Sequence, residues 1–189
     1  RLSCDGLEGS GIYLKEAVAP NGTRLLFTEA NPPLTIPEFV PGLVLNLGEG
    51  ISGWHDGRAG MQYRDLIPDR HGGRYIVSHI RILTGGPVPD YVHHHKIYFQ
   101  MIFCYKGWVK VVYEDQGPPF VMKSGDCVLQ PPHIRHQVLE CSDGMEVIEL
   151  SCPAEHETYT DHGMELPNAK KDPLRNFSGQ RFVFYQAEK

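Results

Sequence analysis

The chain has 189 residues, of which 41% are hydrophobic and 22% charged, a composition typical of a soluble globular protein with one well-buried core. Its net charge of -5 offers no basic field for a phosphate backbone, which excludes nucleic acid as a partner. No apolar run reaches the length of a membrane span, and no signal-peptide core is present, so we expect a cytoplasmic protein without a membrane partner. Five cysteines without Cys-x-x-Cys spacing argue against disulfides and a thiolate zinc site.

The first 72 residues have an irregular pattern. Turn signals occur at residues 20–22 and 41–42, and short apolar stretches occur at residues 24–27 and 43–47. Such punctuation is typical of short strands joined by loops. We therefore expect residues 1–72 to form an N-terminal extension of loops and edge strands.

Residues 73–153 contain a regular succession of short β-type segments separated by Gly, Pro and Asp turn signals. The predicted strands are residues 74–83, 91–95, 98–105, 108–114, 120–122, 126–130, 136–140 and 146–151. No helical period intervenes that would supply crossovers for a parallel sheet, so the pattern predicts an antiparallel sandwich or barrel whose interior is a ready pocket. Residues 154–189 form a polar tail, with a final strand expected at residues 180–186 that pairs with an edge.

The most informative segment for chemistry is the run His93-His94-His95. Alternate side chains share a face of a strand, so His93 and His95 point the same way and His94 points the opposite way. Imidazole is the commonest protein ligand of metals, and a third one from His136 would give a nitrogen-rich site suited to iron, nickel, copper, zinc or manganese. The spacing therefore predicts a mononuclear metal centre.

The segment around these histidines resembles the first motif of the cupin family. In cupins a Gly and five residues precede His-x-His, which is followed after three or four residues by Glu and after six more by Gly. Here Gly86 and six residues precede His93–His95, and four residues later Gln100 is followed after six residues by Gly107. Gln100 thus stands where the family has Glu, and the first interval is one residue longer.

The second cupin motif is Gly, five residues, Pro, any residue, Gly, two residues, His, three residues, Asn. Here the corresponding residues are Gly125, Pro131, His133, His136 and Glu140. His133 replaces a Gly and Glu140 replaces an Asn. The resemblance covers residues 74–152, under half of the chain.

The resemblance implies an all-β fold, a cupin-type double-stranded β-helix (jelly-roll) barrel with an N-terminal extension. It also implies that His93, His95, Gln100 and His136 occupy the four metal-ligand positions. A Gln amide oxygen can coordinate a metal but carries no charge, so the ion would keep its full dipositive charge. Alternatively, Gln100 hydrogen-bonds a ligating imidazole and leaves a three-histidine site.

These features predict an enzyme that uses one divalent metal ion on a small oxygenated organic substrate. Ferrous iron would fit a dioxygenase, as in the three-His cupin dioxygenases that this chain resembles. With nickel, manganese, zinc or copper, Lewis-acid isomerase, hydrolase or lyase chemistry is the alternative. The competing hypothesis is a non-catalytic cupin that binds or senses a small molecule.

Two further residues are candidates for catalysis. Glu140 is expected on the strand face of His136 and could act as a base, and Tyr91 is placed to line or abut the cavity. His133, His156 and the other tail histidine are expected at the surface. Exposed barrel edges invite self-pairing, so a homodimer is also expected.

Overall fold

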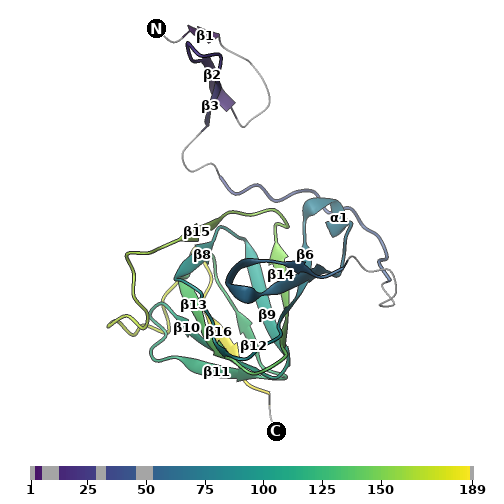
Figure 1. Cartoon of the computed structure of the whole chain (residues 1–189), viewed down its shortest axis with the longest axis vertical. Coiled ribbons are helices and arrows are strands. Elements are labelled where there is room, and N and C mark those ends of the chain that lie inside the picture. Colours follow the sequence, from purple (N-terminus) through teal and green to yellow (C-terminus); the bar gives the residue numbers. More distant parts are fainter. Residues whose placement is uncertain (1–2, 6–12, 29–32, 46–52, 188–189) are drawn as a thin grey trace. The chain divides into compact units, whose positions relative to one another are not determined.

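The computed structural model describes residues 3–5, 13–28, 33–45 and 53–187. The chain forms two compact units, residues 1–35 and 36–189. The first is a three-stranded antiparallel sheet in the order β1 (Ser3–Asp5), β2 (Tyr13–Val18) and β3 (Arg24–Thr28) (Figure 1). The strand expected at residues 24–27 is β3, whereas residues 43–45 form no strand and residues 46–47 lie outside the described residues. The predicted domain boundaries after residues 72 and 153 stay predictions.

The second unit contains two antiparallel sheets. The first has the order β11 (Phe120–Lys123), β10 (Trp108–Tyr113), β13 (His136–Cys141), β8 (His93–His95) and β15 (Thr158–Thr160), with β7 (Gly86–Pro87) also paired to β13. The second has the order β16 (Val183–Tyr185), β12 (Cys127–Leu129), β9 (Phe99–Lys106), β14 (Met145–Cys152), β6 (Ile76–Ile82), β5 (Gln62–Asp65) and β4 (His55–Asp56). Two short helical turns, η1 (Arg58–Gly60) and α1 (Arg70–Gly73), lie in connections.

The core lies between the two sheets because strands of both alternate apolar and polar side chains. On β10, Val109 and Val111 are buried, and on β14, Met145 and Val147 are buried and belong to the same apolar cluster. Their neighbour Glu146 points outward, where its carboxylate contacts Lys106 and His79. This antiparallel, nearly all-β arrangement confirms the predicted antiparallel sandwich or barrel.

The ends of the second unit add strands to both sheets. Strand β15 from the tail pairs with β8, and β16 pairs with β12, in agreement with the final strand expected at an edge. Strand β5 extends the other sheet beside β6. Among the described residues no helix is long and apolar enough to cross a membrane.

Candidate metal centre

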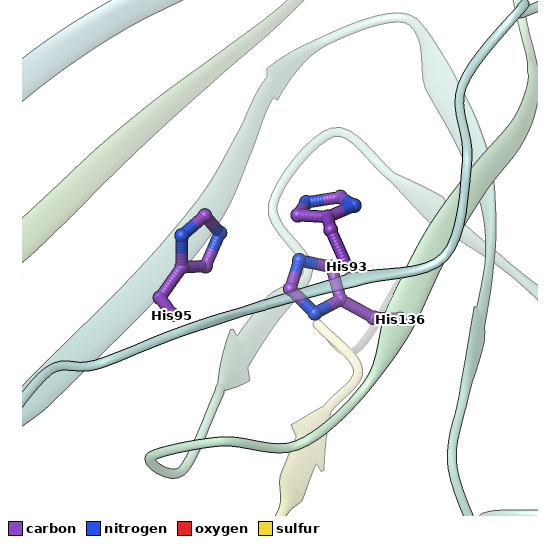
Figure 2. Close-up of side chains that lie close together, drawn as sticks. All are labelled: His93, His95 and His136. Carbon is purple, nitrogen blue, oxygen red and sulfur yellow. The ribbon is translucent and has the colours of Figure 1, made fainter. Parts of the chain in front are cut away.

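Three histidines of the neighbouring strands β8 and β13 lie close together. His93 and His95 share a face of β8, and His136 opens β13 directly opposite His93 in the antiparallel pair. Figure 2 shows the three rings gathered together; the ring centroid of His93 lies 4.1 Å from that of His136 and 5.1 Å from that of His95. One nitrogen of each ring lies within 4.8 Å of one nitrogen of each of the other two. The predicted convergence of these three imidazoles is therefore present.

The Nδ1 atom of each ring is held by an oxygen of the protein. The distances are 2.8 Å from His93 to the carbonyl of Tyr91, 2.8 Å from His95 to the hydroxyl of Thr158, and 3.0 Å from His136 to the carbonyl of Ile134. A carbonyl only accepts hydrogen bonds, so Nδ1 of His93 and of His136 carries the proton and Nε2 carries the lone pair. Such outer contacts fix the tautomer and the ring orientation of a metal ligand.

The three imidazoles favour the neutral form that a metal requires. Burial and, as the next cause, the nearby charge of Arg58 lower the pKa of His93 from 6.5 to about 4. Burial also lowers the pKa of His95 and of His136 well below the usual range, with the neighbouring His93 as the next cause for both. Neutral nitrogen donors in this arrangement fit a divalent transition metal.

The histidines open into a cavity of about 70 Å³ between the two sheets. Most of its wall is apolar, and the polar groups that line it besides the three histidines belong to Arg58, Tyr63, Tyr113 and Glu149. The apolar lining consists of Met61, Ile80, Ile102, Val109, Val111, Met122, Val138, Met145 and Val147. A small, mostly apolar chamber with a few polar groups is the usual form of a ligand site.

Glu149 is the carboxylate in this lining. It lies on the inward face of β14 with Met145 and Val147. Burial raises its pKa, while the charges of His156 and Arg58 and the side chain of Gln100 act in the opposite direction. Glu149 lies within the strand predicted at residues 146–151, and polar residues on both faces of that strand leave its direction open in the sequence.

Arg58 and Asp90 were not identified from the sequence. The guanidinium of Arg58, in η1, donates to Oδ1 of Asp90 at 2.5 Å, and its Nη2 lies 2.6 Å from Nε2 of His93. The Asp90 side chain has no exposed surface, and its other oxygen accepts from the backbone of Val138 at 2.9 Å. Asp90 lies three residues before the His run, which is a weak signal, but no sequence signal links Arg58 to a histidine 35 residues away.

Gln100 is linked to His136 through the side chain of Gln130. Its amide oxygen accepts from Nε2 of Gln130 at 2.6 Å, and that same nitrogen lies 3.2 Å from Nε2 of His136. The hydroxyl of Tyr113 donates to the oxygen of Gln130 at 2.9 Å and so fixes the orientation of this amide. The residue that contacts a ligating imidazole is therefore Gln130, and Gln100 as a metal ligand stays a prediction.

Glu140 does not share the face of His136, which corrects the expectation from the sequence. The pairing of β13 with β10 shifts register after Lys110, so Leu139 has no partner of its own on β10. Such a β-bulge reverses the alternation of faces beyond it. The carboxylate of Glu140 is exposed and lies 3.8 Å from the amine of Lys110, and the next residue, Cys141, is buried instead.

Tyr91 contributes its backbone carbonyl to the site, as the acceptor for His93. Its side chain is 37% exposed and is not part of the cavity lining; the ring lies 5.8 Å from the guanidinium carbon of Arg58 and 5.6 Å from the ring of His162. A direct catalytic role of the Tyr91 phenol stays a prediction.

His94 and His156 lie near the three converging histidines but differ in orientation. His94 points away from the cavity as predicted, and its ring contacts those of His133 and Tyr159. His156 was expected in solvent, but it is half-buried, with its ring centroid 5.6 Å from that of His95 and its Nδ1 3.0 Å from the carbonyl of Pro153. The turn after β14 brings it back toward the site, which the polar composition of the tail does not reveal.

The lowered pKa values of the three histidines predict how the metal-free protein responds to acid. Between about pH 4 and pH 6.5 the unfolded chain binds more protons than the folded one, so the free energy of unfolding falls as the pH decreases through this window. The raised pKa of Glu149 opposes this, but it is one group against three. Urea unfolding of metal-free protein at pH 7, 6 and 5 measures the slope, and His136→Gln should reduce it. Equal stability at all three pH values would contradict the assignment.

Substitution of Thr158 tests whether the hydrogen bond at Nδ1 of His95 contributes to metal binding. Thr158→Val keeps the shape of the side chain but removes the partner of His95, and we expect about 10–100-fold weaker metal binding. Thr158→Ser retains a hydroxyl and should stay within about threefold of the unsubstituted chain. Competition with a chromophoric chelator measures both affinities. Equal affinities of the Val and Ser variants would show that the contact does not orient the ligand.

No protein-family model matches the chain, and no curated protein matches its sequence. Among solved structures, it is similar to an RmlC-like cupin from Shewanella frigidimarina NCIMB 400, with 24% identity, 60% of this chain and 94% of that chain covered, and a TM-score of 0.49. It is also similar to KdgF from Halomonas sp., with 20% identity, 55% of this chain and 90% of that chain covered, and a TM-score of 0.46. A third similar structure is oxalate decarboxylase from Bacillus subtilis, with 20% identity, 66% of this chain and 34% of that chain covered, and a TM-score of 0.46. These similarities concern the fold and do not assign a reaction. The antiparallel barrel and the convergence of His93, His95 and His136 from β8 and β13 agree with what the cupin-like motifs of the sequence imply.

Proposed function

We propose that this protein is a metal-dependent enzyme that acts on a small oxygenated organic compound. The observation that carries the proposal is the geometry of the three histidines: each Nδ1 contacts a protein oxygen, and the rings converge beside a cavity between the two sheets. An imidazole cluster that served only to fill a barrel would not need all three rings oriented in this way.

The donor set fits one divalent ion. His93, His95 and His136 would hold it through neutral nitrogens, and the bound ion would supply Lewis acidity toward a carbonyl, enolate or hydroxyl oxygen of the substrate. Nitrogen donors of this kind suit iron, nickel, manganese, zinc and copper. Three neutral ligands leave the charge of the ion undiminished, which favours an electron-rich substrate oxygen.

Glu149 is the side chain best placed to move a proton. It lines the cavity, and burial raises its pKa, which makes the carboxylate a stronger general base. Glu140 cannot take this role from its position on the outer face beside Lys110. We therefore assign to Glu149 the removal of a proton from the bound compound.

The cavity restricts what can react. Its volume is about 70 Å³, so a compound of a few non-hydrogen atoms, or the reacting end of a longer one, fills it. The apolar wall excludes bulk water and strengthens the electrostatic interactions of Arg58 and Glu149 inside.

The more specific proposal is a dioxygenase. With ferrous iron, a three-histidine ligand set suits oxidation of the bound compound by dioxygen, and a redox-inert ion would instead suit isomerase, hydrolase or lyase chemistry. A carboxylate in the cavity wall is more than a sensing or storage barrel needs, which favours catalysis over simple binding.

Turnover by metal-loaded protein tests this function. Protein reconstituted with ferrous iron is mixed with small β-diketones and 2-oxo acids, and oxygen consumption and product are followed; zinc-loaded protein reports redox-neutral reactions. Glu149→Gln should lower kcat by about 10²–10⁴-fold with the metal content unchanged. The matched control Glu140→Gln, on the outer face, should stay within about twofold.

Two outcomes would contradict the proposal. Ligand binding without oxygen consumption or product under any metal would identify a binding protein instead of an enzyme. Full activity of Glu149→Gln would remove Glu149 from the reaction.

A further inference from the structure

We propose that Arg58 forms an anion subsite beside the metal centre and that the substrate is a small carboxylate. This inference rests on the proposed function and names the substrate class of the same cavity. Its basis is the position of the guanidinium, which lines the cavity and is held by the buried carboxylate of Asp90. Its Nη2 points at Nε2 of His93, the nitrogen that a metal would bind.

The guanidinium cannot leave this position without cost. Asp90 has no exposed side-chain surface and pairs with Arg58 at 2.5 Å, so movement of Arg58 into solvent would leave a buried charge unpaired. The backbone amide of Val138 holds the other oxygen of Asp90 and keeps the carboxylate in place. Arg58 is therefore anchored at one nitrogen, and its other nitrogen faces the histidines.

A metal ion would change the hydrogen bonding of that second nitrogen. In the structure Nη2 of Arg58 lies 2.6 Å from Nε2 of His93, whose Nδ1 is held by a carbonyl. The lone pair of Nε2 can accept from Arg58 or bind a metal, but not both. A metal that took this lone pair would remove the imidazole acceptor of Arg58, at a site where a lost hydrogen bond is costly.

The charges at the site then call for an anion. Arg58 and Asp90 cancel, and Glu149, when ionised, cancels one of the two positive charges of the ion, so at least one positive charge remains among neutral histidines. A monoanion would neutralise it and would separate the guanidinium from the metal. A carboxylate has two oxygens, so one can approach the ion and the other can accept from Arg58.

A second donor lies on the same wall. Tyr63 lines the cavity, and its hydroxyl donates to the sulfur of Met61 at 3.3 Å. A thioether is a weak acceptor, so this hydroxyl can turn to a carboxylate at little cost. The cavity volume fits a short-chain acid or the carboxylate end of a longer one.

Acetate and its neutral analogue acetamide distinguish anion recognition from simple filling of the cavity. Protein is loaded with cobalt(II), the metal content is measured, and the dissociation constants of both probes are obtained from changes in the visible absorption of the cobalt. We expect acetate to bind about 10–100-fold more tightly than acetamide, which corresponds to a charge-assisted hydrogen bond.

Substitutions of Arg58 and Asp90 test whether the guanidinium causes the preference for acetate. The double variant Arg58→Met with Asp90→Asn removes both charges without stranding either, and it should lose the preference for acetate while it retains cobalt. Arg58→Lys keeps the charge toward Asp90 but not the planar fork, and it should bind acetate about tenfold more weakly. The control Arg81→Met removes a guanidinium that hydrogen-bonds Gln62 outside the cavity and should change neither value.

The outcomes separate the two proposals. If cobalt binds and acetate has the same affinity for the unsubstituted chain, the double variant and Arg58→Lys, the anion subsite is wrong and the metal centre stands. If the unsubstituted chain binds no cobalt, both are wrong. If the double variant does not fold, as judged by circular dichroism, Arg58→Lys decides alone.

Discussion

The structure of the site depends on the antiparallel pairing of β8 with β13. This pairing sets His136 opposite His93, and the alternation along β8 adds His95 on the same face. Neither strand could hold three imidazoles in this way by itself, because side chains two residues apart on one strand form a row and not a triangle. A register slip of one residue would turn either strand's histidines to the other face and remove the site.

The surrounding elements each contribute one constraint to this arrangement. Strand β15 brings the hydroxyl of Thr158 to His95, and η1 brings Arg58 to His93. Gln130, which follows β12, reaches His136. Each contact comes from a different part of the chain, so the rings are oriented by the folded barrel and not by local sequence. The Thr158 contact at Nδ1 is compatible with a bound metal, whereas Arg58 and Gln130 contact the Nε2 atoms that a metal would take and so orient the rings in the metal-free protein.

The parts of the site that follow from local periodicity could be predicted, and the parts that follow from tertiary contacts could not. Period-two alternation placed the histidines of β8, and the motif spacing added His136. The same rule failed for Glu140 because the unpaired Leu139 reverses the faces of β13, and a bulge leaves no clear mark in the sequence. Arg58 was missed because nothing local predicts a contact across 35 residues.

The metal content of three variants tests the central claim most directly. The unsubstituted chain, loaded with zinc or iron and passed through a desalting column, should retain one ion per chain by plasma mass spectrometry. His95→Ala and His136→Ala should lose most of it, while His94→Ala should retain it because His94 faces away toward His133 and Tyr159. Equal metal content in all three variants, or none in the unsubstituted chain, would contradict the three-histidine centre.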